Sequence, residues 1–190
     1  MENINDKKLV ELAIKKPDDF RYIIEKYEKK LFWYLKRITN FRDEDLEDLL
    51  QEIFIKVYRN LNNYDEKLKF SSWIYRIAHN EAISYFRKNK KRQEDVSVDW
   101  EYDEKFLQRV TNDFKINDEI DNNKLGEQIF GILYQMDIKY REVLVYKYFE
   151  EKSYDEISDI IKKPVNTVGT YMSRAKKQFN NILEKNNITL

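Results

Sequence analysis

The stretch "SYDEISDIIKKPVNTVGTYMSRAKKQF" occupies residues 153–179 and predicts two helices joined by a tight turn. Ser153 and Glu156 have the spacing of a capping box, in which each side chain bonds the backbone N–H of the other residue. Three isoleucines then give the first helix an apolar face, and the Lys-Lys-Pro that follows ends it, because proline cannot continue a helix. Asn166 or Thr167 is suited to cap the second helix.

The second helix of this stretch has one apolar face and one polar, basic face. Its apolar residues fall at spacings of four, three and four, namely Val168, Met172, Ala175 and Phe179. The other face carries hydroxyl and basic side chains together with Gly169, which has none. Such a pair is typical of a helix-turn-helix, in which Arg and Lys contact DNA phosphates and Arg can bond a guanine edge. A plain helical hairpin with a solvated basic face is the alternative.

The composition of the whole chain favours helices and disfavours an enzyme. Only 3 Gly and 2 Pro occur in 190 residues, too few for the turns of a sheet protein, so we expect an all-α fold. The absence of cysteine excludes disulfides, thiol nucleophiles and cysteine-type zinc sites, and it fits a cytoplasmic protein. His79 is the only histidine and no Gly-rich phosphate loop occurs, so we expect no catalysis, cofactor or metal. No apolar run is long enough to span a membrane.

Charge is distributed unevenly along a chain whose formal net charge is +0. Residues 1–92 carry 21 Lys and Arg against 16 Asp and Glu, a balance of +5. Residues 93–122 carry 3 against 10, a balance of −7, and residues 123–190 carry 11 against 9, a balance of +2. We therefore expect two small helical domains, residues 1–92 and 123–190, joined by an acidic flexible linker over residues 93–122.

Hydrophobic periodicity predicts four helices on each side of this linker. In the first domain they are expected at residues 7–14, from about 18 to 38, from after residue 45 to about 61, and from a cap at Ser71 or Ser72 to about residue 89. In the second domain they are expected at residues 120–136, 139–151, 153–161 and 165–184.

The third predicted helix has an apolar stripe of leucines and, opposite to it, an unusual polar face. Rotation by about 100° per residue places five residues together on that face: Asp48, Gln51, Glu52, Ile55 and Arg59. An isoleucine surrounded by polar residues is the pattern of a protein interface with an apolar centre and a charged rim. A tolerated surface isoleucine is the alternative, since single exposed apolar residues are ordinary.

The fourth predicted helix carries a polar stripe that continues into a basic cluster. Arg76, Asn80, Ser84 and Arg87 fall at spacings of four, four and three, and Lys88 opens the sequence KNKKR. Arg and Asn are suited to phosphates and base edges, and the basic cluster adds salt-sensitive attraction to nucleic acid.

Several aromatic residues lie near the start of the fourth helix: Tyr64, Phe70, Trp73 and Tyr75. Aromatic and basic residues together can bind unstacked bases of a single strand. Trp73 is at least equally well explained as a buried core residue.

Two segments of the chain together resemble the sigma-70 family of transcription initiation factors. "DLEDLLQEIFIKVYRNL" followed by "KFSSWIYRIAHNEAISYFRKNKKR" resembles the second conserved region of the family. "YREVLVYKYFEEKSYDEISDIIKKPVNTVGTYMSRAKKQF" resembles its fourth region. The short chain and the bare linker between the two segments are similar to the extracytoplasmic-function (ECF) group.

The resemblance implies roles for both domains. Factors of this family bind the RNA polymerase core and direct it to promoters. Asp48, Gln51, Glu52 and Ile55 would then dock on the core, and the fourth helix with the loop before it would bind and help open the −10 element through Arg76, Asn80, Ser84, Arg87 and Lys88. The helix from Val165 would enter the major groove at the −35 element, where the candidate DNA contacts are Thr167, Gly169, Thr170, Ser173, Arg174 and Lys177. An anti-sigma protein is a further expected partner, and the free chain is expected to be a monomer.

This sequence departs from the family pattern at several positions. Gly169 and Tyr171 stand where basic residues are frequent, so Thr170, Ser173 and Arg174 carry more of the expected discrimination. Lys163 stands where the family often has the glycine of the turn. Ser84 replaces a frequent aspartate, and His79 replaces a frequent arginine.

Two other kinds of function are compatible with parts of the pattern. A dimeric helix-turn-helix regulator would use only the C-terminal motif, and its N-terminal helices would form the dimer without polymerase. A helical adaptor that binds no nucleic acid would leave both basic surfaces unexplained.

Overall fold

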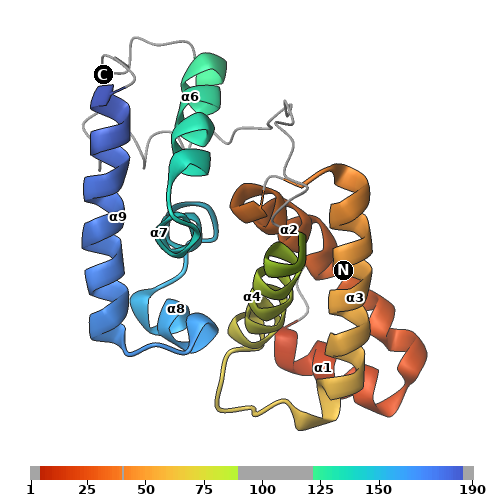
Figure 1. Ribbon diagram of the computed structural model, residues 1–190. Coiled ribbons are helices and arrows are strands. Elements are labelled where there is room, and N and C mark those ends of the chain that lie inside the picture. Colours follow the sequence, from red (N-terminus) through yellow and green to blue (C-terminus); the bar gives the residue numbers. More distant parts are fainter. Residues whose placement is uncertain (1–4, 40, 90–121, 186–190) are drawn as a thin grey trace. The chain divides into compact units, whose positions relative to one another are not determined.

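The computed structural model describes residues 5–39, 41–89 and 122–185, so the predicted acidic linker lies almost entirely outside the described residues. Within these ranges the chain is helical and contains no strand, as the sequence predicts. The helices form two compact units, which Figure 1 colours red to yellow-green for the N-terminal unit and green to blue for the C-terminal unit. None of the described helices is long and apolar enough to cross a membrane.

Among its described residues, the N-terminal unit contains four α-helices and two short 3-10 turns: α1 (Asp6–Lys15), η1 (Pro17–Phe20), α2 (Arg21–Thr39), α3 (Asp43–Asn60), η2 (Leu61–Asn63) and α4 (Phe70–Asn89). Pro17 ends α1 and opens η1, so the second helix begins in a 3-10 turn. The predicted cap at Ser71 or Ser72 is wrong. The helix begins earlier, with the Trp73 N–H bonded to the Lys69 carbonyl, and Ser72 is fully buried in its first turn.

The core of this unit is built from aliphatic stripes and interlocking aromatic rings. The predicted leucine stripe of α3 is buried against α2 and α4. Edge-on ring pairs join distant parts of the chain: the centroids of Tyr34 and Tyr75 are 5.2 Å apart, and those of Tyr27 and Phe70 are 5.7 Å apart. Such pairs contribute about 0.5–1.5 kcal/mol beyond the area they bury. They hold α2 and α4 together.

The described part of the C-terminal unit contains four α-helices and one π-helical turn: α6 (Asn122–Gln135), α7 (Ile138–Leu144), η3 (Val145–Phe149), α8 (Tyr154–Ile161) and α9 (Val165–Lys185). The segment expected as one helix at 139–151 therefore changes to π geometry after Leu144, where the Glu150 N–H bonds the Val145 carbonyl. Val145 and Tyr146, at the start of this wider turn, are both fully buried in the core.

A buried arginine closes the end of α6. The Arg141 guanidinium donates to the carbonyl oxygens of Tyr134 (2.9 Å) and Met136 (3.2 Å), which the helix end leaves without partners. Arg141 is only 7% exposed, and this burial lowers its pKa to about 10. The neighbouring Glu142 is also buried and accepts a hydrogen bond from the Tyr146 hydroxyl.

The predicted capping box at the start of α8 is confirmed. The Glu156 N–H donates to Ser153 Oγ at 3.2 Å, and the Ser153 N–H donates to Glu156 Oε2 at 2.9 Å. The predicted cap of α9 at Asn166 or Thr167 is wrong, because the helix starts before them. The N–H groups of Thr167 and Val168 bond the carbonyl of Pro164.

The turn between α8 and α9 depends on a lysine in the left-handed conformation. Lys162 has a φ of 51°, and the Lys163 N–H reaches back to the Ser158 carbonyl at 3.3 Å, which is the bond that closes a Schellman motif. The Ser158 hydroxyl also donates to the Lys163 carbonyl at 2.6 Å. The family pattern indicates a glycine at the position of Lys163. In this structure, however, the backbone conformation that favours glycine occurs one position earlier, at Lys162.

Replacing this lysine by glycine tests the strain in the turn. An L-residue in the left-handed conformation destabilises the folded state by about 1–2 kcal/mol, and glycine avoids this strain. Glycine loses more backbone entropy on folding, which offsets about 0.5–1 kcal/mol of that stabilisation. We expect Lys162→Gly to stabilise the C-terminal unit by about 0.5–1 kcal/mol, measured by amide hydrogen exchange in α8 and α9. Lys163→Gly removes the same charge at a residue without positive φ and is the matched control. Equal effects of the two substitutions would contradict this account.

Candidate functional site

The predicted polymerase-binding face lies on the outside of α3. Asp48, Gln51, Glu52 and Ile55 are all exposed, while Leu49 and Ile53 on the opposite face are buried. Ile55 is 51% exposed, the largest exposed fraction among the large apolar side chains of the described residues. The apolar centre with a polar rim that the sequence predicts is therefore present on this helix.

A groove of about 710 Å³ runs beside this face, between α3 and α2. Gln51 and Ile55 line it from α3 together with Leu50 and Phe54, whereas Asp48 and Glu52 do not. The α2 side of the groove was not predicted, and it is formed by Ile24, Glu28, Lys29 and Phe32. Three of these four residues fall at intervals of four along α2, a stripe that could have indicated them from the sequence.

The predicted −10 stripe follows the length of α4. Asn80, Ser84, Arg87 and Lys88 are exposed, and Arg76 lies two turns into the same helix. The stripe ends in the cationic side chains at the C-terminus of α4, where positive charge complements the helix dipole. The four exposed side chains present hydrogen-bonding groups along one surface of α4, whereas Arg76 is half-buried.

A smaller hollow of about 290 Å³ lies between the end of α3 and α4. Of the predicted −10 residues only Asn80 lines it, beside the amides of Asn60 and Asn63. An ion pair between Lys56 of α3 and Glu81 of α4 stands at its rim. The hollow therefore combines amide donors and acceptors with a paired charge.

The predicted aromatic platform for single-stranded bases is wrong for most of its members. Phe70, Trp73 and Tyr75 are 2%, 9% and 2% exposed. Trp73 stacks on Phe70 with centroids 5.5 Å apart, and Tyr64 packs edge-on against Phe70 at 5.3 Å. Burial of such large rings stabilises the fold, so Trp73 is a core tryptophan, with one edge reaching the hollow beside Asn80.

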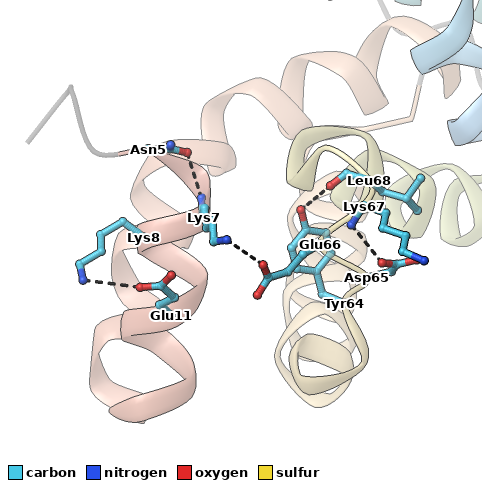
Figure 2. Close-up of polar contacts among 9 residues, drawn as sticks. All are labelled: Asn5, Lys7, Lys8, Glu11, Tyr64, Asp65, Glu66, Lys67 and Leu68. Carbon is cyan, nitrogen blue, oxygen red and sulfur yellow. Dashed lines mark hydrogen bonds and ion pairs between the residues drawn. The ribbon is translucent and has the colours of Figure 1, made fainter.

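The loop before α4 is tied to α1, as Figure 2 shows. The Tyr64 hydroxyl donates to the Leu68 carbonyl, and the Lys67 N–H donates to Asp65 Oδ1, so the loop is closed on itself. From α1, Lys7 Nζ reaches Glu66 Oε2 at 2.9 Å, and this hydrogen bond is the main cause of the raised pKa of Lys7. No local sequence pattern predicts this connection, because Lys7 and Glu66 lie 59 positions apart.

A second contact fastens α1 to α2. The Asp6 carboxylate accepts a hydrogen bond from the Tyr27 hydroxyl at 2.8 Å and pairs with Lys26 at 2.9 Å. Burial, reinforced by the Asp6 charge, raises the pKa of Tyr27 well above its ordinary value of 10. The folded protein thus keeps this phenol protonated.

The predicted −35 residues lie along the face of α9 opposite its buried residues. Thr170, Ser173, Arg174 and Lys177 are exposed, and Thr167 and Gly169 are half-buried. Within the described part of the chain, neither Arg174 nor Lys177 forms an ion pair. The described residues of the two units also hold no cluster of His, Asp and Glu that could bind a metal ion.

Comparison with known families gives the class of protein. Sequence models of Sigma-70 region 2 and Sigma-70 region 4 match residues 23–92 and 127–179. The ECF RNA polymerase sigma factor SigW of Bacillus subtilis is 31% identical over 182 residues, covering 93% of this chain and 95% of SigW. The chain is a sigma-70 family protein, a class that directs RNA polymerase to promoters and is not a class of enzymes.

Other relatives fit the same group. The ECF RNA polymerase sigma-E factor of Escherichia coli K12 is 28% identical over 187 residues, covering 95% of each chain. Among solved structures, CnrH in complex with the cytosolic domain of CnrY matches with a TM-score of 0.68 and 18% identity, over 95% of this chain and 97% of CnrH. RpoE of Bartonella quintana, solved with the anti-sigma factor NepR, matches with a TM-score of 0.64 and 17% identity, over 87% of this chain and 97% of RpoE. Within the sigma-70 family, this chain belongs to the ECF group.

The contact between Tyr27 and Asp6 has a measurable pH signature. Because the unfolded tyrosine ionises near pH 10 and the folded one does not, this contribution to stability is complete below pH 10 and declines above it. We expect Tyr27→Phe to lower the free energy of unfolding by about 1 kcal/mol at pH 7 and to make the decline above pH 10 shallower.

The measurement is urea unfolding followed by tryptophan fluorescence between pH 7 and 11. Tyr58→Phe, at a tyrosine of the same unit that is 46% exposed, is the control for stability at pH 7. If the free energy of unfolding of Tyr27→Phe declined above pH 10 as steeply as that of the unsubstituted chain, the assigned role of the phenol would be contradicted.

Proposed function

We propose that the N-terminal unit binds the RNA polymerase core through Asp48, Gln51, Glu52 and Ile55 of α3. The supporting observation is the exposure of all four residues beside a groove with apolar lining. Protein interfaces have this composition, with an apolar centre and a polar rim. Ile24 and Phe32 of α2 complete the apolar lining, and we include them in the docking surface.

The −10 element is bound by α4 and the loop before it. Arg76, Arg87 and Lys88 contact phosphates, and Asn80 and Ser84 supply neutral polar contacts. The hollow beside Asn80, with amides on its rim and the edge of Trp73 in its lining, has the volume and the polar groups for one unstacked base. The connection of the loop to α1 limits its motion, which favours binding by lowering the entropy lost.

The −35 element is bound as duplex DNA by the helix-turn-helix of α8 and α9. Arg174 and Lys177 supply charge to the phosphates and base edges, while Thr167, Gly169, Thr170 and Ser173 lie between them along the helix. We assign residues 1–92 to the first domain, 93–122 to the acidic linker and 123–190 to the second domain.

The same proposal covers partners and location. The chain acts in the cytoplasm with polymerase and promoter DNA, carries no catalysis, cofactor or metal of its own, and is a monomer when free. CnrH and RpoE were both solved with partner proteins, and RpoE's partner is an anti-sigma factor. An anti-sigma protein is therefore the regulatory partner that we propose for this chain.

Reconstitution tests the function directly. The purified chain mixed with bacterial core polymerase should produce promoter-specific transcripts, and light scattering should give a monomer in its absence. The dimeric regulator is the competing function. It predicts a stable homodimer that binds duplex DNA tightly without polymerase, and that result together with undetectable core binding at micromolar concentration would reject the proposal.

The α3 face can be tested with two isoleucines of nearly equal exposure. We expect Ile55→Asp to weaken core binding at least tenfold, because a charge replaces the apolar centre of the interface. Ile14→Asp is the matched control, since Ile14 on α1 is 47% exposed and does not line the groove. Affinity is measured by fluorescence anisotropy with labelled chain, and equal losses in the two variants would reject the assigned face.

The α9 face can be tested with two cations of the same helix. Arg174→Ala should lower promoter affinity of the holoenzyme about tenfold or more and leave core binding unchanged. Lys176 lies over the ring of Tyr148, away from the exposed face, so Lys176→Ala removes a charge without removing a proposed contact. A filter-binding assay compares the two, and a loss of core affinity in Arg174→Ala would count against this role.

A further inference from the structure

A hollow on the polar, basic face of α9 contains two exposed apolar side chains among polar ones. It has a volume of about 570 Å³ and includes Tyr154, the first residue of α8, and Val165, the first residue of α9. These side chains are 36% and 38% exposed, and among the described residues of the C-terminal unit they are the only large apolar ones so exposed. The side chains of Tyr154 and Val165 therefore lie together on the surface where we propose that DNA binds.

Gly169 forms part of the same hollow. A Cβ atom added at this position would meet nothing within 4 Å, so no neighbour in the fold requires a glycine there. Glycine in the middle of a helix is unfavourable relative to alanine. The missing side chain leaves space on the outer surface rather than making room for packing inside the unit.

Thr170 adds to the apolar character of this surface. Its hydroxyl donates to the Asn166 carbonyl at 2.9 Å, so the hydroxyl hydrogen is already used within the helix. What remains for a ligand is the methyl group and the acceptor lone pairs of the oxygen. Thr170 can therefore contact a base through its methyl group or as a hydrogen-bond acceptor.

The aromatic wall of the hollow is held in place by a cation. Lys147 Nζ lies 5.8 Å from the centroid of the Tyr154 ring. This contact orients the ring, and it places positive charge beside the hollow, as Arg174 does on α9. Two apolar side chains among polar ones, flanked by cations, match a ligand that has apolar groups within a negatively charged framework.

We propose that this hollow receives the 5-methyl group of a thymine in the major groove of the −35 duplex. Thymine is the only one of the four bases that presents an apolar group there, so an apolar site on a DNA-reading helix has one matching base. Val165 and Tyr154 form its walls and Gly169 provides the space. The assignment rests on the proposed function, and it makes Val165, Tyr154 and Gly169 determinants of promoter specificity.

The test removes the methyl group from the DNA while leaving the hydrogen-bonding edge unchanged. Holoenzyme first selects its −35 sequence from a pool of promoters randomised at that element. Each thymine of the selected element is then replaced in turn by deoxyuridine. We expect one or two of these replacements to weaken binding about three- to fivefold, the effect of losing one buried methyl group.

The protein variant identifies the residue that reads the methyl. Val165→Ser should weaken binding to the thymine duplex by a similar factor. It should have little further effect on the deoxyuridine duplex, because the protein substitution and the loss of the thymine methyl group remove the same contact. Arg174→Ala is the comparison, and it should weaken both duplexes equally. Circular dichroism checks that Val165→Ser keeps its helix content.

A 5-methylcytosine at the sensitive position separates methyl contact from DNA shape. It should bind about two- to fivefold more tightly than unmethylated cytosine there. No gain from this methyl group would overturn the proposal, as would tolerance of deoxyuridine at every position or equal effects of Val165→Ser on both duplexes. In those three cases the proposed function stands. A holoenzyme that selects no −35 sequence would instead reject the function and this assignment together.

Discussion

The burial of one apolar stripe from every helix is the interaction on which both units depend. In α3 the residues Leu46, Leu49, Ile53 and Val57 are at most 1% exposed, and in α9 Val168, Met172 and Ala175 are at most 2% exposed. Removal of these side chains from water stabilises each unit and fixes the rotation of each helix about its axis. The rotation in turn decides which residues face outward. The proposed polymerase-binding and promoter-binding faces are therefore consequences of the same packing.

The connections between the described helices contain no glycine. All three glycines lie inside helices, and the two described residues with positive φ outside glycine are Glu151 and Lys162. Side chains carry out much of the capping instead: Ser153 and Glu156 at the start of α8, Ser158 across the turn before α9, and Arg141 at the end of α6. The direction of α9 after the turn depends on these contacts. The orientation of the proposed DNA-reading face therefore depends on them as well.

The surfaces proposed for function are all formed by more than one helix. The groove beside Ile55 needs Ile24 and Phe32 of α2, the hollow beside Asn80 needs Asn60 and Asn63, and the hollow over Gly169 needs Tyr154 of α8. The periodicity of a single helix therefore identifies only the residues that this helix contributes to each surface. This is why the sequence predicted Gln51, Asn80 and Gly169 but missed the residues opposite to them.

The sequence by itself determined the all-α fold, the order of the helices, the capping box and the family, because these depend on residues within about four positions of one another or on two motifs in a fixed order. Where the prediction was wrong, contacts between residues far apart in the sequence determined the structure. Phe70, Trp73 and Tyr75 form a core instead of a platform for bases, because rings from α2 and from the loop before α4 cover them. The link between Lys7 and Glu66 also arises from a tertiary contact. Local periodicity shows that one face of a helix is buried, but only the neighbours brought together in space decide which of its other residues remain accessible to a partner.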